Sequence, residues 1–198
     1  MQMQAFERLR QFADRPRAVE QCELCGREVA SEHDHVVDPV PRRLMCVCGP
    51  CAILFTNQSG TGRKRVPRRV RLLEDFQLSD GQWDALRLPI NLAYFVDSSP
   101  QGRVIACYPS PAGATESLLP LEAWEEILQD NPVLRTLEPD VEALLVNRIG
   151  SASDYYLAPI DQCYRLVGLI RMRWSGLSGG TEVWKAIAGF FAELRQRA

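Results

Sequence analysis

This sequence lacks long hydrophobic runs, contains only two histidines and has almost no net charge. No run approaches the roughly 18 apolar residues of a membrane-spanning helix, and residues 1–17 (MQMQAFERLRQFADRPR) lack the apolar centre of a signal peptide. Lys and Arg number 23 against 25 Asp and Glu, a net charge of −2, which excludes a global positive field for nucleic acid or anionic lipid. We therefore expect a cytoplasmic protein with no membrane insertion.

Cysteine, in contrast, is concentrated in one segment. Five of the seven cysteines and both histidines lie within residues 22–51. Their order is Cys22-x-x-Cys25, His33-x-His35 and Cys46-x-Cys48-x-x-Cys51. Clustered cysteines in a reducing compartment are more often ligands than disulfides, and zinc and other borderline metals prefer thiolate and imidazole ligands. The segment therefore predicts a metal site, with zinc as the metal.

The spacing of two C-x-x-C pairs favours one ligand set over the others. Gly follows the second cysteine of the first pair and the first cysteine of the second pair, and it permits the tight turn of a zinc knuckle. Residues 52–55 can form the first turn of a helix after the second pair, as in a treble clef; a zinc ribbon has similar spacing. The preferred tetrad is Cys22, Cys25, Cys48 and Cys51.

Three candidate ligands remain outside this tetrad. Alternation in an extended chain puts Cys46 on the same face as Cys48, so Cys46 is an alternative to Cys48 as a ligand. His33 and His35 also share a face if their segment is extended. With Cys46 they would make a second site, for which the sequence names no fourth ligand. The other interpretation places both histidines at the surface or in a turn.

Residues 48–51 also spell C-G-P-C, the dithiol of thioredoxin-like proteins. That chemistry needs a βαβ unit around the motif, which the surrounding sequence does not predict. Residues 22–51 further resemble a degenerate HNH-type treble clef, because Asp34-His35-Val36-Val37-Asp38-Pro39 is similar to the segment that carries the general base in those nucleases. HNH enzymes need a further His or Asn on the next helix, and Asn57 has the wrong offset. The resemblance therefore implies the scaffold rather than the chemistry.

The rest of the chain predicts a mixed α+β fold in three segments: an N-terminal helix within residues 1–19, the metal module at 20–62 and an α+β domain at 63–198. Expected strands cover residues 90–96, 103–108, 141–149 and 155–158, and expected helices cover 120–129 and 159–174. A capping box at Ser79 opens a short helix. Residues 109–117 are expected to form a loop. Thr181 is expected to cap a last helix with Trp184 on its apolar face, and Cys107 and Cys163 to be core thiols.

A basic stretch follows the metal module. Its cations are Arg63, Lys64, Arg65, Arg68, Arg69 and Arg71. These cations could bind the phosphates of a nucleic acid, although no aromatic residues lie between them to stack on bases. A solvated strand face is the expectation that we prefer, and a nucleic-acid-binding module derived from the HNH-like scaffold is an alternative.

Several longer motifs resemble an uncharacterised bacterial domain family of unknown function, often encoded beside uptake nickel–iron hydrogenase genes. They are the cysteine–histidine segment, residues 108–116 (YPSPAGATE), 140–148 (DVEALLVNR), 159–171 (PIDQCYRLVGLIR), 174–180 and 190–191. The resemblance implies a hydrogenase accessory or maturation role, with hydrogenase subunits or maturation factors as partners. It also implies that Cys163 is more than a core thiol.

We therefore expect a metal-binding accessory or assembly factor with structural zinc, and no catalytic residues. An iron or iron–sulfur protein that moves electrons or delivers iron is an alternative, because thiolate-rich sites serve iron as well as zinc.

Overall fold

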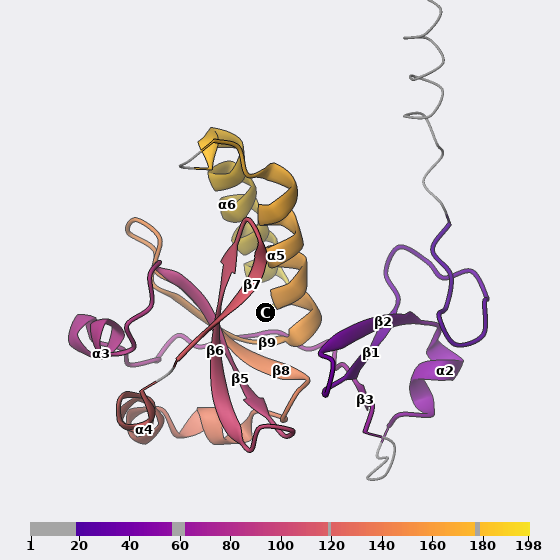
Figure 1. Cartoon of the computed structure of the whole chain (residues 1–198), viewed down its shortest axis with the longest axis horizontal. Helices are drawn as coiled ribbons and strands as arrows, with labels where there is room; N and C mark the ends of the chain where they lie inside the picture. Colours follow the sequence, from indigo (N-terminus) through magenta and orange to yellow (C-terminus); the bar gives the residue numbers. More distant parts are fainter. Residues whose placement is uncertain (1–18, 57–61, 119, 177–178) are drawn as a thin grey trace, which may run out of the picture.

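The structure is a computed structural model that describes residues 19–56, 62–118, 120–176 and 179–198. Most of the N-terminal helix expected within residues 1–19, and residues 57–61 of the metal module, lie outside the described residues. The strands form two antiparallel sheets, a small one near the N-terminus and a large one flanked by helices (Figure 1). Within the described ranges, none of the helices has the length and apolar character that crossing a membrane requires.

The small sheet has the order β2-β1-β3. Its strands are β1 (Asp34–Asp38), β2 (Arg43–Val47) and β3 (Lys64–Arg65), and helix α2 (Gly49–Ile53) follows β2 directly. Alternation along the hairpin buries Val36, Met45 and Val47, which pack with Ala52 of α2 and with Cys22. The metal module therefore has a very small apolar core of its own.

The large sheet has the order β4-β9-β8-β5-β6-β7. Its strands are β4 (Arg71–Leu72), β5 (Leu92–Ser98), β6 (Arg103–Ser110), β7 (Gly113–Ser117), β8 (Glu142–Asn147) and β9 (Asp154–Pro159). Four of these strands lie where the sequence predicts them. The loop expected over residues 109–117 is wrong, because β6 runs on to Ser110 and a tight turn leads into the edge strand β7. Pro109 is tolerated because it lies beyond the part of β6 that pairs with β5.

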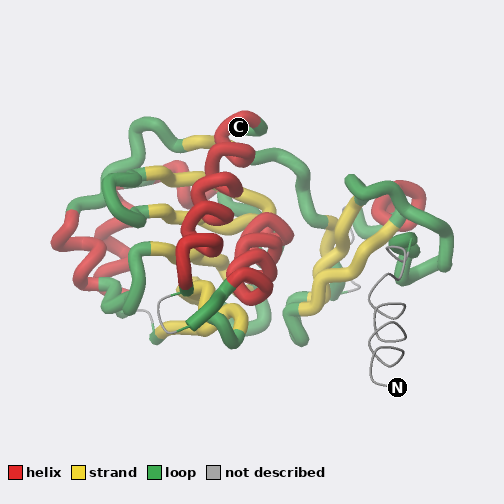
Figure 2. Tube along the Cα trace, turned by 90° about the horizontal axis from the view of Figure 1, so that it is seen from above, coloured by secondary structure: helices red, strands yellow, loops and turns green. Residues whose placement is uncertain are grey.

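Helices cover both faces of the large sheet (Figures 1 and 2). One face packs against α5 (Ile160–Arg173) and α6 (Gly180–Gln196), and the other against α3 (Asp80–Ala85), α4 (Leu121–Asp130) and the 3-10 helix η1 (Pro132–Thr136). Along β8, Leu145 faces the first layer, whereas its neighbours Leu144 and Val146 face the second. A strand covered on both sides has no polar face, which explains its unbroken apolar sequence.

The ends of two helices test the predicted caps. Ser79 forms the expected capping box with Gln82 at the start of α3. Thr181 is not the cap of α6, because the helix already begins at Gly180 and Gly179 precedes it in the left-handed conformation, with a φ of 87°. Trp184 is 44% exposed rather than part of the core, and Val183 takes the buried position beside it.

The small and large sheets share one apolar core. Val37 of β1 and Val66 and Val70 of the basic stretch belong to the same buried cluster as Ile160 and Cys163 of α5. The basic stretch joins the sheets, since β3 pairs with β1 and β4 pairs with β9. The metal module is therefore packed directly on the α+β domain.

Candidate metal centre

The first cysteine pair lies in a tight loop before β1. An isolated bridge between Gln21 and Glu28 closes the loop, and the Gly26 N–H donates to the Cys22 carbonyl at 2.8 Å. Gly26 has a φ of 73°, in the left-handed region that favours glycine. The loop therefore turns Cys22 and Cys25 toward the same point, as a zinc knuckle does.

The second pair comes from the junction of β2 and α2. Cys48 precedes the helix in extended conformation, and Pro50 and Cys51 lie in its first turn. The Ala52 N–H donates to the Cys48 carbonyl at 2.9 Å, which fixes the turn between the two ligands. A knuckle, a hairpin and a helix start that supply two ligand pairs form the arrangement of a treble clef. Since C-G-P-C follows a strand of an antiparallel hairpin, the βαβ context of a dithiol oxidoreductase is not found around it.

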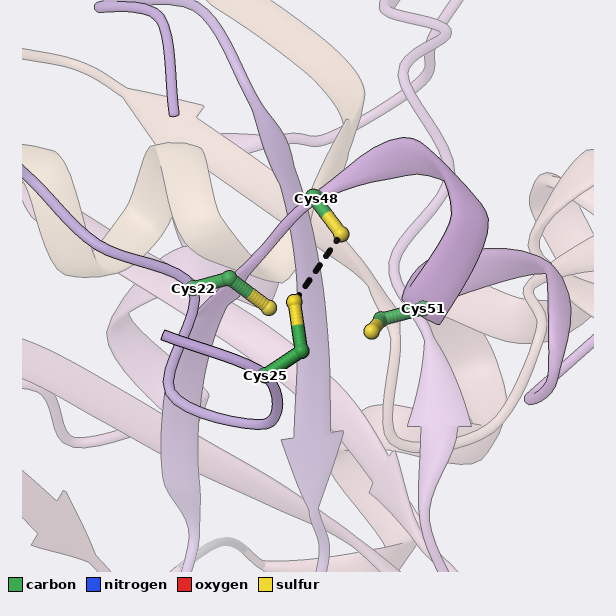
Figure 3. A group of neighbouring side chains, drawn as sticks. All are labelled: Cys22, Cys25, Cys48 and Cys51. Atoms are coloured by element: carbon green, nitrogen blue, oxygen red, sulfur yellow. Dashed lines mark hydrogen bonds between the residues drawn. The ribbon is translucent and has the colours of Figure 1, made fainter. Parts of the chain in front are cut away.

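The four sulfurs converge (Figure 3). The Sγ atoms of Cys22, Cys25, Cys48 and Cys51 all lie within 4.8 Å of one another, and Cys25 Sγ is 3.7 Å from Cys48 Sγ. A tetrahedral zinc ion with Zn–S bonds of about 2.3 Å requires sulfurs about 3.8 Å apart. The tetrad therefore fits a four-coordinate metal, and the same donor set suits zinc or iron.

The surroundings of the tetrad shift the pKa values of two of its thiols in opposite directions. Burial acts to raise the pKa of Cys22, but the backbone N–H groups of Cys48, Leu24 and Cys25 stabilise its thiolate and lower the pKa to about 6. Cys51 shows the opposite effect, because its contact with Cys48 favours the protonated thiol and, with burial, raises the pKa to about 12. A metal that binds all four thiolates therefore releases protons, and its affinity falls as the pH falls.

Cys46 lies apart from the tetrad. It is paired with His35 across the hairpin, and it falls with His33 and His35 in a second group whose ligand atoms lie within 4.8 Å of one another. Glu23 of the knuckle holds Cys46 by both backbone groups, since the Glu23 N–H donates to its carbonyl at 2.9 Å and Glu23 Oε1 accepts from its N–H at 2.9 Å. Burial and the charges of Glu20 and Glu23 raise the pKa of the Cys46 thiol.

The cations of the basic stretch are largely paired within the chain. Arg65 and Arg68 both contact the buried carboxylate of Asp34, Arg63 pairs with Asp38, and Lys64 lies 2.7 Å from Asp140. Arg71 donates to the hydroxyl of Thr136. Through these contacts the basic stretch joins elements of the fold. These cations therefore do not form an unpaired cationic face for phosphates.

Two carboxylates near the cysteines were not predicted as site residues. Asp161 Oδ2, at the first turn of α5, lies 3.0 Å from His35 Nδ1, and Glu20 Oε2 lies 3.5 Å from His33 Nδ1. Asp161 is 126 residues from His35, and no local pattern points to such a pair. Glu20 lies only two residues before Cys22, so its proximity to the cysteines was the one available signal.

Together, the two sheets and the cysteine tetrad define an α+β protein with a treble-clef arrangement of four cysteines that could hold a metal ion. The chain belongs to a family of unknown function (DUF5947), whose model matches residues 21–198. No curated protein and no solved structure matches the chain significantly. The family match begins one residue before Cys22 and runs to the C-terminus, so it includes the metal module and the α+β domain together.

Proposed function

We propose that the chain is a metal-binding accessory or assembly factor in which Cys22, Cys25, Cys48 and Cys51 hold structural zinc. The observation that carries this proposal is that four sulfurs from two turns converge within the metal module. The apolar core of this module is the smallest of the three buried clusters. A module of this size buries too little apolar surface to fold alone, so metal binding supplies the missing free energy. Four protein ligands also leave no open coordination position, as in structural sites.

The first test removes one knuckle. The Cys22→Ala/Cys25→Ala variant should lose the tetrad metal and the fold of the metal module, because structural zinc is worth about 10–16 kcal/mol of apparent binding energy in small modules. Metal content and the melting temperature should be compared with a Cys107→Ala control, which removes a buried cysteine far from the tetrad. Unchanged stability together with unchanged metal content in the double variant would contradict the proposal.

The identity of the metal separates structural zinc from the iron alternative. Metal analysis and a visible spectrum should be recorded on protein purified without oxygen. A colourless zinc protein is the expected result. Iron with thiolate charge-transfer bands would instead support a redox or iron-delivery protein.

We extend the proposal to a hydrogenase partner in the cytoplasm, which rests on the family resemblance of the sequence motifs. The wild type should copurify with hydrogenase subunits or maturation factors on coexpression, and the Cys22→Ala/Cys25→Ala variant should not. If neither the wild type nor the variant copurifies with these proteins, the hydrogenase link is wrong. Equal recovery with both would show that the link does not depend on the tetrad, and either outcome leaves the metal measurements unaffected.

A further inference from the structure

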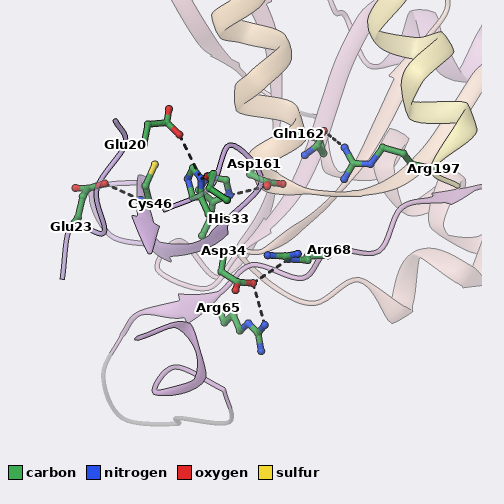
Figure 4. Close-up of polar contacts among 12 residues, drawn as sticks. Glu20, Glu23, His33, Asp34, Cys46, Arg65, Arg68, Asp161, Gln162 and Arg197 are labelled. Carbon is green, nitrogen blue, oxygen red and sulfur yellow. Dashed lines mark hydrogen bonds and ion pairs between the residues drawn. The ribbon is translucent and has the colours of Figure 1, made fainter. Parts of the chain in front are cut away.

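One face of the β1–β2 hairpin carries the residues that the tetrad does not use. His35 lies directly opposite Cys46, and His33 shares their face two residues upstream. Val37 is on this face too, and it packs in the core that includes Ile160 of α5. Since His35 also contacts Asp161 of α5, this face is turned toward the α+β domain. Figure 4 shows His33, Cys46 and Asp161 close together.

The hydrogen bonds of the two imidazoles leave the same nitrogen free on each ring. His33 Nδ1 donates to the Ala30 carbonyl at 2.8 Å, and His35 Nδ1 donates to Asp161 Oδ2 at 3.0 Å. These contacts assign the proton to Nδ1 and leave a lone pair on Nε2 in both rings. Metal-binding histidines are commonly oriented in this way, with the outer nitrogen donating to a carbonyl or a carboxylate.

Two buried atoms at this face lack partners. The His33 side chain is only 8% exposed, and its Nε2 has no hydrogen-bond partner among the described residues. Asp161 Oδ1 is likewise buried without a partner among them. Unpaired polar atoms in a buried site destabilise the fold, and a cation between Cys46 and the two rings would satisfy His33 and offset the charge of Asp161.

We propose that His33 Nε2, His35 Nε2 and Cys46 Sγ bind a second divalent transition metal of the zinc class, with water as the fourth ligand. The three ligand atoms already lie within 4.8 Å of one another, and the two ring centroids are 4.7 Å apart. Two imidazoles and one thiolate, completed by water, are a donor set that zinc accepts in tetrahedral geometry.

This second site differs from the tetrad in its accessibility. Its three protein ligands leave one coordination position for water, through which the metal can exchange, whereas the four cysteines of the tetrad leave none. A cavity of about 330 Å³ lined by His33, His35 and Asp161 gives a route to the rings. The second ion is therefore exchangeable, and through His35 and Asp161 its binding is coupled to the docking of the metal module on α5.

Cobalt provides the test, because Co²⁺ occupies zinc sites and its visible bands report the number of thiolate ligands. Metal-free full-length protein should bind two Co²⁺ ions, one in a four-thiolate and one in a one-thiolate environment. His33→Ala and Cys46→Ala should each lose only the second ion, whereas Cys22→Ala/Cys25→Ala should lose the four-thiolate spectrum. One ion in the wild type, or two in both His33→Ala and Cys46→Ala, would overturn the second site without touching the tetrad.

Two milder variants guard against effects of misfolding. Asp161→Asn changes a positioning residue and should weaken Co²⁺ at the second site by about 10–100-fold. Glu20→Gln is at the surface, removes the charge that lies 3.5 Å from His33 Nδ1, and should weaken Co²⁺ less than Asp161→Asn does. The four-thiolate bands should stay unchanged in both variants. An Asp161→Asn variant with lower stability but unchanged Co²⁺ affinity would show that the contact between His35 and Asp161 only stabilises the fold and does not orient a metal ligand.

Discussion

Cys163 shows how burial decides the chemistry of a residue. It lies on α5 with an exposed fraction of 0%, and burial raises the pKa of its thiol well above the usual value. A thiol must ionise and be reached to react. The structure therefore supports the expectation of a core thiol over the larger role that the family resemblance implies.

We predict that Cys163 resists alkylation in the folded protein, even near pH 8.5, where a free cysteine is half ionised. A raised pKa keeps the neutral form present to higher pH, so the rate should not rise through this range as it does for a peptide thiol. In metal-free protein the cysteines of the unfolded metal module should react first, because unfolding exposes their thiols. Mass spectrometry after a maleimide pulse measures both rates, and comparable labelling of Cys163 would contradict the prediction.

Asp34 is the buried carboxylate that anchors the basic stretch. It is 8% exposed and accepts from Arg65 Nη2 at 3.1 Å and from Arg68 Nε at 3.2 Å. Asp34→Asn should lower the free energy of unfolding by about 1–3 kcal/mol, because it removes the charge that both guanidinium groups face. Denaturant unfolding at neutral pH measures this loss. Asp75→Asn, at a position outside this network, is the control and should change stability little.

At the residue scale, the sequence predicts what is local and misses what is distant. The cysteine tetrad follows from two short spacings, each within one turn of the chain. Asp161 could not be predicted as the partner of His35, because only the docking of α5 on the hairpin brings them together.

Among the elements, the connection between α5 and α6 requires glycine at position 179. A Cβ at Gly179 would lie 2.8 Å from Val183 Cγ1 and 3.2 Å from the Trp174 ring, at a φ of 87°. Gly179→Ala should therefore destabilise the protein by roughly 2–5 kcal/mol, from left-handed strain and overpacking together.

Gly176→Ala is the matched control for this loop. Gly176 also has a positive φ, of 61°, but a Cβ there meets nothing within 4 Å. Its cost should be limited to about 1–2 kcal/mol of backbone strain. Thermal unfolding measures the loss of stability in Gly179→Ala and in Gly176→Ala. Equal losses would show that the contacts with Val183 and Trp174 do not contribute.

The elements that the sequence predicts are those with a strong apolar pattern. The strands β5, β8 and β9 are buried on both faces and read as continuous apolar segments. Strand β7 reads as a loop because it is a half-exposed edge strand of Gly, Ala, Thr, Glu and Ser. Its pairing with β6 depends on the turn at residues 111–112 rather than on its own composition.

In the whole molecule, polar contacts reinforce the shared core between the two parts. Lys64 Nζ lies 2.7 Å from Asp140, which is 5% exposed at its side chain and also accepts from Ser99. Arg42 pairs with Glu116 at 2.9 Å. The α+β domain thus holds the metal module at several points, of which His35–Asp161 is one.

We predict that Lys64→Met destabilises the docked state by about 1–3 kcal/mol, because the Asp140 carboxylate stays buried with fewer partners. Hydrogen exchange should rise first in β1 and β3. The exposed pair Lys185–Glu182 offers a control, since Lys185→Met removes an ion pair with both side chains 70% exposed and should change stability by less than about 1 kcal/mol. Unchanged hydrogen-exchange protection of β1 in Lys64→Met would contradict a role for the contact between Lys64 and Asp140 in docking.

The separation of His35 from Asp161 along the chain also orders events during synthesis. The tetrad is complete once Cys51 has left the ribosome, whereas Asp161 follows about 110 residues later. At 5–20 residues per second this delay is roughly 5–20 s. The four cysteines of the tetrad are therefore all available well before α5 exists, and the contact between His35 and Asp161 forms only after the chain has been synthesised as far as α5.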